Sequence, residues 1–141
     1  MIREKSCGAV ILKKEEEIKV LLVQMKNGGH FSFPKGHVEG NETETETATR
    51  EIMEETSLRV KFIKGFRKST EYSPEEGVLK EVIYFLAVPE EGGFIPQEEE
   101  ILSIKWFSEK EAVDAVTYHN DKIILRDALS FFKSLDNAEY L

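Results

Sequence analysis

Residues 33–58 constrain the fold of this chain more than any other segment. The segment reads FPKGHVEGNETETETATREIMEETSL, a Pro-Lys-Gly turn signal followed by a glutamate-rich run. Asn41 is expected to be a helix N-cap, with Glu44 completing a capping box. The helix would bury Ala48 and Ile52, which lie four residues apart on one face. An extended run, a glycine turn and an acidic helix together indicate a site for phosphate and metal.

Three carboxylates are expected to converge on this helix. Glu51, Glu54 and Glu55 are spaced i, i+3 and i+4, which places them on one side. Like charges at this spacing destabilise an isolated helix by about 0.2–0.5 kcal/mol per pair. A solvated acidic face is the simpler interpretation, but Arg50 is the only basic residue between Glu39 and Glu55. A hard divalent cation bound by carboxylate oxygens explains the pattern better, and Mg²⁺ is the usual one beside phosphates.

The spacing of these residues resembles the signature of the Nudix hydrolases. That family cleaves nucleoside diphosphates linked to another moiety, using Mg²⁺ or Mn²⁺. The family usually has glycine where this chain has Ser57. Because the position suits a left-handed helix C-cap, serine is expected to cost about 1 kcal/mol there. The matching positions are Gly36, Glu42, Arg50, Glu51, Ile52, Glu54, Glu55 and Leu58.

The resemblance implies roles for individual residues. One of the two glutamates Glu54 and Glu51 would be the catalytic base, and Arg50 would orient a glutamate by charge-assisted hydrogen bonds. A further metal-binding glutamate is expected a few residues before Trp106, while Glu98 and Glu99 are expected to be solvated. The implied metal ligands are Gly36, through its carbonyl, and Glu51, Glu54, Glu55 and Glu100.

A second set of residues resembles the asymmetrical dinucleoside tetraphosphate hydrolases, which split diadenosine tetraphosphate into ATP and AMP. The set comprises residues 31–39, Gly65-Phe66, Tyr72 and residues 80–87. In that subfamily an adenine stacks between aromatic side chains from two loops, and Tyr72 and Tyr118 fit this description. The residues expected to contact substrate are Lys35, His37, Tyr72, Lys80, Tyr84 and Tyr118.

Composition indicates one globular domain over residues 1–141. The chain is 40% hydrophobic and 33% charged, and its net charge of −8 argues against a broad surface for nucleic acid or anionic membrane. The charge also means that cations must separate an acidic site from a polyanionic substrate. The only cysteine, Cys7, is expected in the core and fits a reducing cytoplasm. No signal peptide or membrane span is expected.

The remaining segments predict a layered α/β fold. Strands are expected at 4–13, 18–25, 58–66, 78–88 and 101–107, with a short extended piece at 31–33 and loops at 70–77 and 89–99. Ser108 and Glu111 predict the start of a helix that ends near Val116, and Asn120 or Asp121 the start of another. The resemblance makes this the α/β/α sandwich of the Nudix fold, with a mixed sheet. The apolar stripe of the last helix comprises Ile124, Leu125, Ala128, Leu129 and Phe132.

The expected function is metal-assisted hydrolysis of a phosphoanhydride in a small nucleotide, with diadenosine tetraphosphate as the foremost substrate. Two alternatives within the family are an RNA 5′-pyrophosphohydrolase and a nucleoside triphosphate pyrophosphatase. The absence of a basic stripe weighs against the RNA enzyme. A third alternative is a nucleotide-binding Nudix module without activity. Such a module would be expected to lack carboxylates of the signature, and all of them are present.

Overall fold

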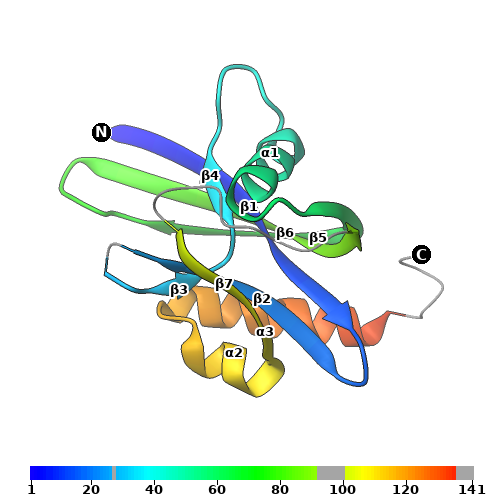
Figure 1. Cartoon of the computed structure of the whole chain (residues 1–141). Helices are drawn as coiled ribbons and strands as arrows, with labels where there is room; N and C mark the ends of the chain where they lie inside the picture. The colour runs from blue at the N-terminus through cyan, green and yellow to red at the C-terminus, as the bar shows by residue number, and fades with distance from the viewer. Residues whose placement is uncertain (27, 92–100, 136–141) are drawn as a thin grey trace.

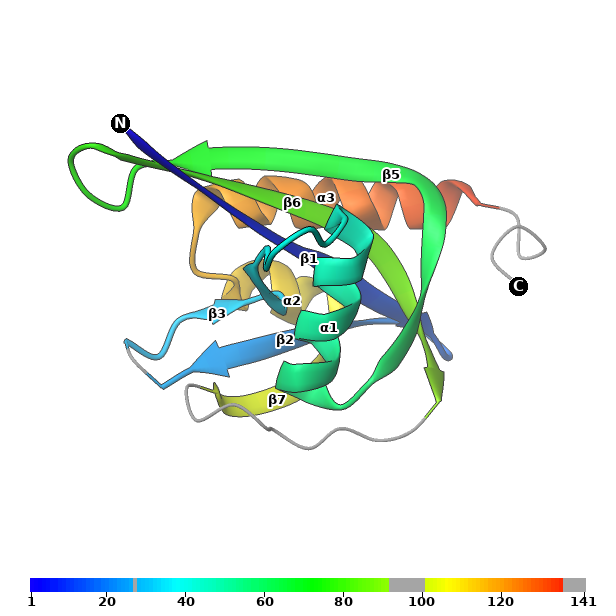
Figure 2. The same ribbon diagram turned by 90° about the horizontal axis from the view of Figure 1, so that it is seen from above.

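Three layers stack in the order helix, sheet, helices in this computed structural model, which describes residues 1–26, 28–91 and 101–135. Helix α1 (Glu44–Thr56) covers one face of the sheet. Helices α2 (Glu109–Ala115) and α3 (His119–Ser134) cover the other (Figures 1 and 2). The predicted α/β/α sandwich is confirmed.

The seven strands of the described chain form one mixed sheet. Its order is β3-β2-β1-β6-β5, with β4 paired to β1 and β7 paired to β2. Strand β1 runs parallel to β6, in register from Ile2↔Val78 to Ile11↔Ala87, and the other pairs of described strands are antiparallel. The strands are β1 (Ile2–Lys14), β2 (Ile18–Met25), β3 (Phe31–Ser32), β4 (Lys35–His37), β5 (Arg59–Tyr72), β6 (Val78–Glu91) and β7 (Ile101–Ser108).

Strand β1 divides the core by the alternation of its side chains. Val10 and Leu12 pack in one cluster with residues of α2 and α3. Ala9 and Ile11 pack on the α1 side, as does Cys7, which is fully buried as predicted. Burial raises the pKa of the Cys7 thiol to about 11, so it stays protonated at neutral pH.

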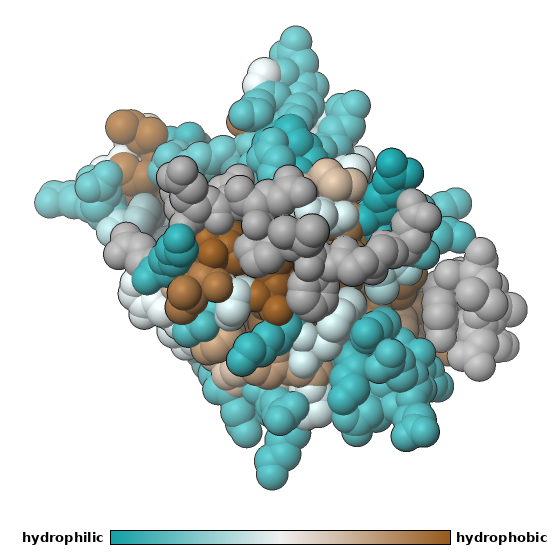
Figure 3. Space-filling view, in the orientation of Figure 1, coloured by the Kyte–Doolittle hydropathy of each residue, from teal (hydrophilic) through white to brown (hydrophobic). Residues whose placement is uncertain are grey.

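One face of the molecule is polar above and below the sheet (Figure 3). Hydrophilic side chains cover most of the face in Figure 3, above the sheet over α1 and below it over α2 and α3. No helix in the described part of the chain is long and apolar enough to cross a bilayer.

The β5–β6 hairpin is longer than predicted. Strand β5 continues to Tyr72, because its pairing with β6 resumes after a register shift between Phe62 and Arg67. The predicted loop at 70–77 therefore shrinks to residues 73–77, and Tyr72 is a strand residue opposite Lys80. The predicted loop at 89–99 is also wrong at its start, since β6 extends to Glu91, and its remainder lies outside the described residues.

Helix α1 begins later than predicted. Its N-cap is Thr43, whose Oγ1 accepts a hydrogen bond from the Glu46 backbone N–H at 3.1 Å, while Glu46 Oε1 accepts one from the Thr43 N–H at 2.8 Å. The capping box is therefore Thr43–Glu46 and not Asn41–Glu44. Threonine three residues before glutamate offers the same spacing, two positions further on.

The predicted start of α2 is confirmed, and the predicted start of α3 is wrong. Ser108 caps α2 in a capping box with Glu111, as predicted. Tyr118, rather than Asn120 or Asp121, is the N-cap of α3, and it makes no side-chain cap bond. The two polar side chains of the first turn instead reach other elements. The predicted apolar stripe is buried at all its positions: Ile124, Leu125, Ala128, Leu129 and Phe132.

Candidate active site

Strand β4 lies at the centre of the candidate site. Sequence reasoning predicted a turn at Lys35 and Gly36, but both belong to this strand, which pairs with β1. Successive strand residues point to opposite faces. A Cβ on Gly36 would lie 2.0 Å from the Glu51 carboxyl carbon. A Cβ on Gly8 would lie 2.6 Å from the Lys35 Cβ. Glycine at both positions therefore lets α1 pack on one side of β4 and lets β4 lie close to β1.

Arg50 organises the acidic face of α1. Its Nε donates to Glu42 at 2.7 Å, and its Nη1 donates to Glu51 at 2.9 Å and to Glu54 at 3.2 Å. Its Nη2 donates to the His37 backbone carbonyl at 2.9 Å. Hydrogen bonds from Arg50 lower the pKa of Glu42 to about 2. The charge-assisted bonds predicted for Arg50 are present, and they hold three glutamates of the signature together: Glu42, Glu51 and Glu54.

The three predicted carboxylates are not arranged as a metal site in this structure. The described residues contain no group of three or more His, Cys, Asp or Glu side chains placed to hold a metal ion. Arg50 binds Glu51 and Glu54, whereas Glu55 is buried, so the convergence of all three carboxylates on one metal ion stays a prediction. The predicted fifth ligand, Glu100, lies outside the described residues.

The donor set nevertheless fits a hard divalent cation. The donors are oxygens, which Mg²⁺ and Mn²⁺ prefer. The Glu51 carboxylate occupies the space that a side chain at position 36 would fill. A cation, the Arg50 guanidinium, already bridges Glu51 and Glu54. Metal binding by these residues stays a prediction.

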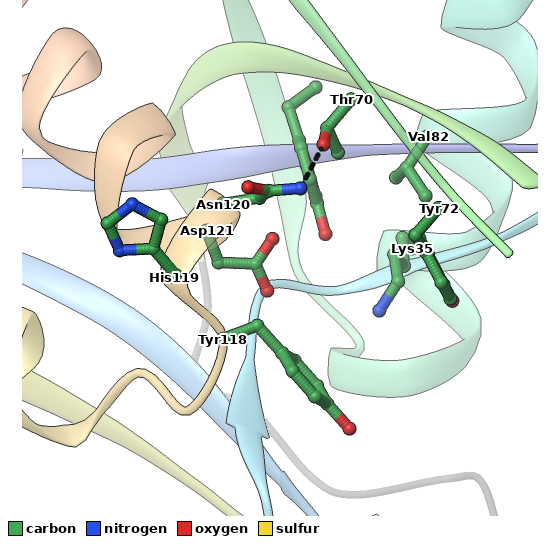
Figure 4. Close-up of a pocket in the computed structure, with 9 residues that line it drawn as sticks. Lys35, Thr70, Tyr72, Val82, Tyr118, His119, Asn120 and Asp121 are labelled. Atoms are coloured by element: carbon green, nitrogen blue, oxygen red, sulfur yellow. Dashed lines mark hydrogen bonds between the residues drawn. The ribbon is translucent and has the colours of Figure 1, made fainter. Parts of the chain in front are cut away.

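A pocket of about 330 Å³ lies beside β4 (Figure 4). Tyr72 from β5 and Tyr118 from the start of α3 line it, with exposed fractions of 43% and 53%. Val82 and Tyr84 from β6 line it too, and both are buried. The two tyrosines predicted to clamp a nucleobase thus share one pocket. Its other lining residues are Lys35, Thr70, His119, Asn120 and Asp121.

Lys35 lines the pocket, and the next residue, Gly36, lies against Glu51 of the acidic helix. Burial lowers the pKa of its ammonium, while the charges of Asp121 and Glu55 oppose this shift. Asp121 is 6% exposed and accepts a hydrogen bond from Ser32 Oγ at 3.1 Å. Burial raises the pKa of Asp121, and Lys35 acts in the opposite direction. The charge of Lys35 is therefore stabilised by one acidic group in the pocket, Asp121, and by a second acidic group on α1, Glu55.

The other predicted substrate residues fall into different places. Tyr84 is 1% exposed and packs edge-on against Phe33, with ring centroids 5.3 Å apart. The Lys80 amine lies 6.0 Å from the Tyr72 ring centroid, next to the pocket but not among its lining residues. His37 is exposed and gives its backbone carbonyl to Arg50. Its ring does not line the pocket either.

Sequence reasoning missed the polar residues contributed by the first turn of α3. Asn120 Nδ2 donates to Thr70 Oγ1 at 2.9 Å, which ties this helix to β5. Asp121 points into the pocket (Figure 4). A signal was available, because Asp121 lies three and four residues before Ile124 and Leu125 and so shares the buried face of the helix. Assigning Asn120 or Asp121 as a helix cap obscured it.

Comparison with known proteins identifies the family. The profile described as NUDIX domain matches residues 3–128 of the chain.

The chain belongs to the Nudix family.

Among curated relatives, this Nudix chain is 32% identical to the bis(5′-nucleosyl)-tetraphosphatase [asymmetrical] of Sus scrofa, over 93% of this chain and 97% of that protein. It is 31% identical to the protein of that name from Mus musculus, over 92% and 96% of the two chains. Among solved structures, a C. elegans Ap4A hydrolase in a binary complex matches with a TM-score of 0.86 and 27% identity. That match covers 94% of this chain and 99% of the other.

These matches confirm two predictions. The resemblance to Nudix hydrolases, based on the spacing around Arg50, was correct, as was the closer resemblance to asymmetrical tetraphosphate hydrolases. The chain is therefore a Nudix hydrolase by family. The single domain over residues 1–141 and the roles of individual residues stay predictions.

Proposed function

We propose that this protein hydrolyses diadenosine tetraphosphate to ATP and AMP, with Mg²⁺ or Mn²⁺ as its cofactor. One observation carries the proposal: two exposed tyrosines share a pocket with Lys35, and the next residue of β4, Gly36, lies against Glu51 of α1. Relatives that carry the name of this activity align with almost the whole chain. The proposed substrate is a small nucleotide, and the proposed location is the cytoplasm, in keeping with the single, buried cysteine.

The pocket suits one nucleoside of the substrate. Its volume of about 330 Å³ lies in the range of small-molecule sites. A base stacked on Tyr72 and Tyr118 would gain about 1–3 kcal/mol. The phosphates of the same nucleotide would then pass Lys35 on their way to α1, and Lys80 adds a second positive charge near Tyr72. A polyphosphate with a nucleoside at one end satisfies both parts of the site.

The residues of α1 supply the chemistry. A bound divalent cation would neutralise phosphate charge and acidify the attacking water. Arg50 orients Glu51 and Glu54 through its Nη1. The Glu54 side chain is 46% exposed and that of Glu51 13%, so Glu54 has the better access to a water and is our choice for the base. The residues proposed to hold the metal are Gly36, Glu51, Glu54, Glu55 and Glu100.

A side-by-side assay tests the proposal. Diadenosine tetraphosphate, 5′-triphosphorylated RNA and a nucleoside triphosphate are incubated with the protein and Mg²⁺, and the products are separated by chromatography. We expect the dinucleotide to be cleaved fastest, giving ATP and AMP in equal amounts, and excess chelator to stop the reaction. Faster cleavage of the RNA would instead assign the chain to the RNA 5′-pyrophosphohydrolases.

Two variants separate the site from general effects of charge. Glu55→Gln should lower turnover by about 100-fold or more, because it removes a buried carboxylate from the proposed metal site. Glu76→Gln, in the exposed turn between β5 and β6, should behave like the parent. Full activity of Glu55→Gln, or undiminished activity in chelator, would refute a metal site on α1. Absence of hydrolysis of every substrate by the parent would favour the binding module.

A further inference from the structure

Asp121 is the one acidic residue among the described side chains that line the tyrosine pocket. It is the third residue of α3 and is only 6% exposed. Figure 4 shows its carboxylate directed into the space between Asn120 and Lys35. A buried carboxylate needs donors or counter-charges around it. Its position inside the pocket makes a ligand atom one of the groups that can meet this need.

The Asp121 carboxylate is held by one hydrogen bond but can accept further hydrogen bonds. Ser32 Oγ donates to Asp121 Oδ2 at 3.1 Å. Within the described part of the chain, Ser32 is the only hydrogen-bond donor to this carboxylate, and Lys35 acts on it through charge. A carboxylate offers about four lone-pair sites. Most of them therefore remain for a donor that enters the pocket.

The neighbouring amide is less available to a ligand. Asn120 Nδ2 already donates to Thr70 Oγ1 at 2.9 Å, which fixes that side chain against β5. Of the polar groups that α3 gives to the pocket, Asp121 is thus the strongest acceptor with open positions. An acceptor of this kind selects for an N–H donor and disfavours a carbonyl oxygen in the same place.

This inference rests on the proposed function, in which a nucleobase lies between Tyr72 and Tyr118. Stacking on aromatic rings barely distinguishes one base from another, because every base has a π-face. Selectivity must therefore come from the edge of the base. We propose that Asp121 accepts a hydrogen bond from the exocyclic amino group of adenine and so favours this base over a purine that lacks the group.

Binding of two mononucleotides tests this role without any hydrolysis. Purine riboside 5′-monophosphate differs from AMP only by lacking the 6-amino group. Calorimetric titration of the parent protein should show AMP bound about tenfold more tightly, as expected for one hydrogen bond to a charged acceptor. In Asp121→Leu this ratio should fall to about one, because AMP loses affinity while the analogue does not.

Two further variants separate reading of the base from support of the pocket. Ser32→Ala removes the hydrogen bond of 3.1 Å to Asp121 but keeps the carboxylate. Its ratio of affinities for AMP and the analogue should therefore stay close to that of the parent. Asp121→Asn retains the shape of the side chain and should lower the ratio in the same direction as Asp121→Leu. Its amide has one acceptor atom, and its NH₂ group would oppose the amino group of adenine.

Two results would overturn the inference. One is equal weakening of AMP and the analogue in the Asp121 variants, which would mean that Asp121 only supports the structure of the pocket. The other is equal affinity of the parent protein for the two nucleotides. Neither result bears on hydrolysis of diadenosine tetraphosphate, which is scored separately by the release of ATP and AMP.

Discussion

At the scale of single residues, Arg50 shows why the site depends on geometry as much as on charge. One guanidinium donates to three carboxylates and one backbone carbonyl, using Nε, Nη1 and Nη2 in a fixed plane. A lysine carries the same charge, but its ammonium cannot present this planar fork. Gly36 is equally specific, because the Glu51 carboxylate fills the place of its missing Cβ.

The tyrosine pair gives the first prediction. Tyr72→Ala and Tyr118→Ala should each raise the Michaelis constant for diadenosine tetraphosphate about tenfold, with smaller effects on turnover, because stacking of 1–3 kcal/mol is lost from binding. Steady-state kinetics on each variant measures the effect. Ile123→Ala is the control, since Ile123 is a large, exposed apolar residue of α3 that does not line the pocket. Unchanged kinetics in both tyrosine variants would remove the clamp.

Ser57 gives a second prediction at this scale. It is the C-cap of α1, and with φ of 66° it is the one residue other than glycine with positive φ in the described chain. Ser57→Gly should raise the free energy of unfolding by about 1 kcal/mol, because glycine adopts this conformation without strain. Urea unfolding measures the change. Ser57→Ala keeps the strain and removes the hydroxyl, so a gain in that variant as well would contradict this explanation.

At the scale of elements, the packing of α1 depends on an ion pair at its first turn. Glu44 accepts from Arg67 Nε and Nη2, both at 2.8 Å, and pairs with Lys5 at 2.5 Å. One carboxylate therefore joins the helix to β5 and to β1. Hydrogen bonds from Arg67, followed by those from Lys5, lower the pKa of Glu44 from 4.5 to about 2.

This carboxylate sets a prediction for stability in acid. A depressed pKa means that its contribution is present above pH 4.5 and is lost as the pH falls towards 2. Glu44→Gln should lower the free energy of unfolding by about 1 kcal/mol at pH 7, a figure reduced for solvent screening. The difference from the parent should vanish near pH 2. Urea unfolding over this range measures it, and a difference that persists at pH 2 would exclude ionisation as the cause.

The elements also show what sequence alone can predict. The run around Arg50 is local, since its spacing within one helix brings its side chains together, so it could be read directly. The residues around the pocket are distant in the sequence. Ser32 and Asp121, which share a hydrogen bond, are 89 positions apart, so no pattern within one element brings them together. The pairing of Tyr72 with Lys80 depends on a register shift between strands, and the alternation of apolar residues in the sequence does not predict such a shift. Only the resemblance to a family placed Tyr72 and Tyr118 together.

At the scale of the whole molecule, a ligand of the native state should stabilise the fold. If α1 binds Mg²⁺, a free concentration of 100 times the dissociation constant adds about 2.7 kcal/mol, which raises the melting temperature by several degrees. Thermal unfolding with Mg²⁺ and with chelator measures this. Glu54→Gln should abolish most of the shift, and Glu76→Gln should keep it. An equal shift in both variants would place the metal elsewhere.

The parallel pairing of β1 with β6 has a consequence for how the chain reaches this structure. Ile2 lies opposite Val78 and Ile11 opposite Ala87, so the two central strands are joined across 76 positions. During synthesis β1 can pair only with β2 and, over Ser6–Gly8, with β4 until the residues of β6 have been made. Pairings this distant in sequence form slowly, and unpaired apolar strands are prone to aggregate in the meantime. The edge of β1 that pairs with β6 therefore stays without its partner until more than half of the chain has been made.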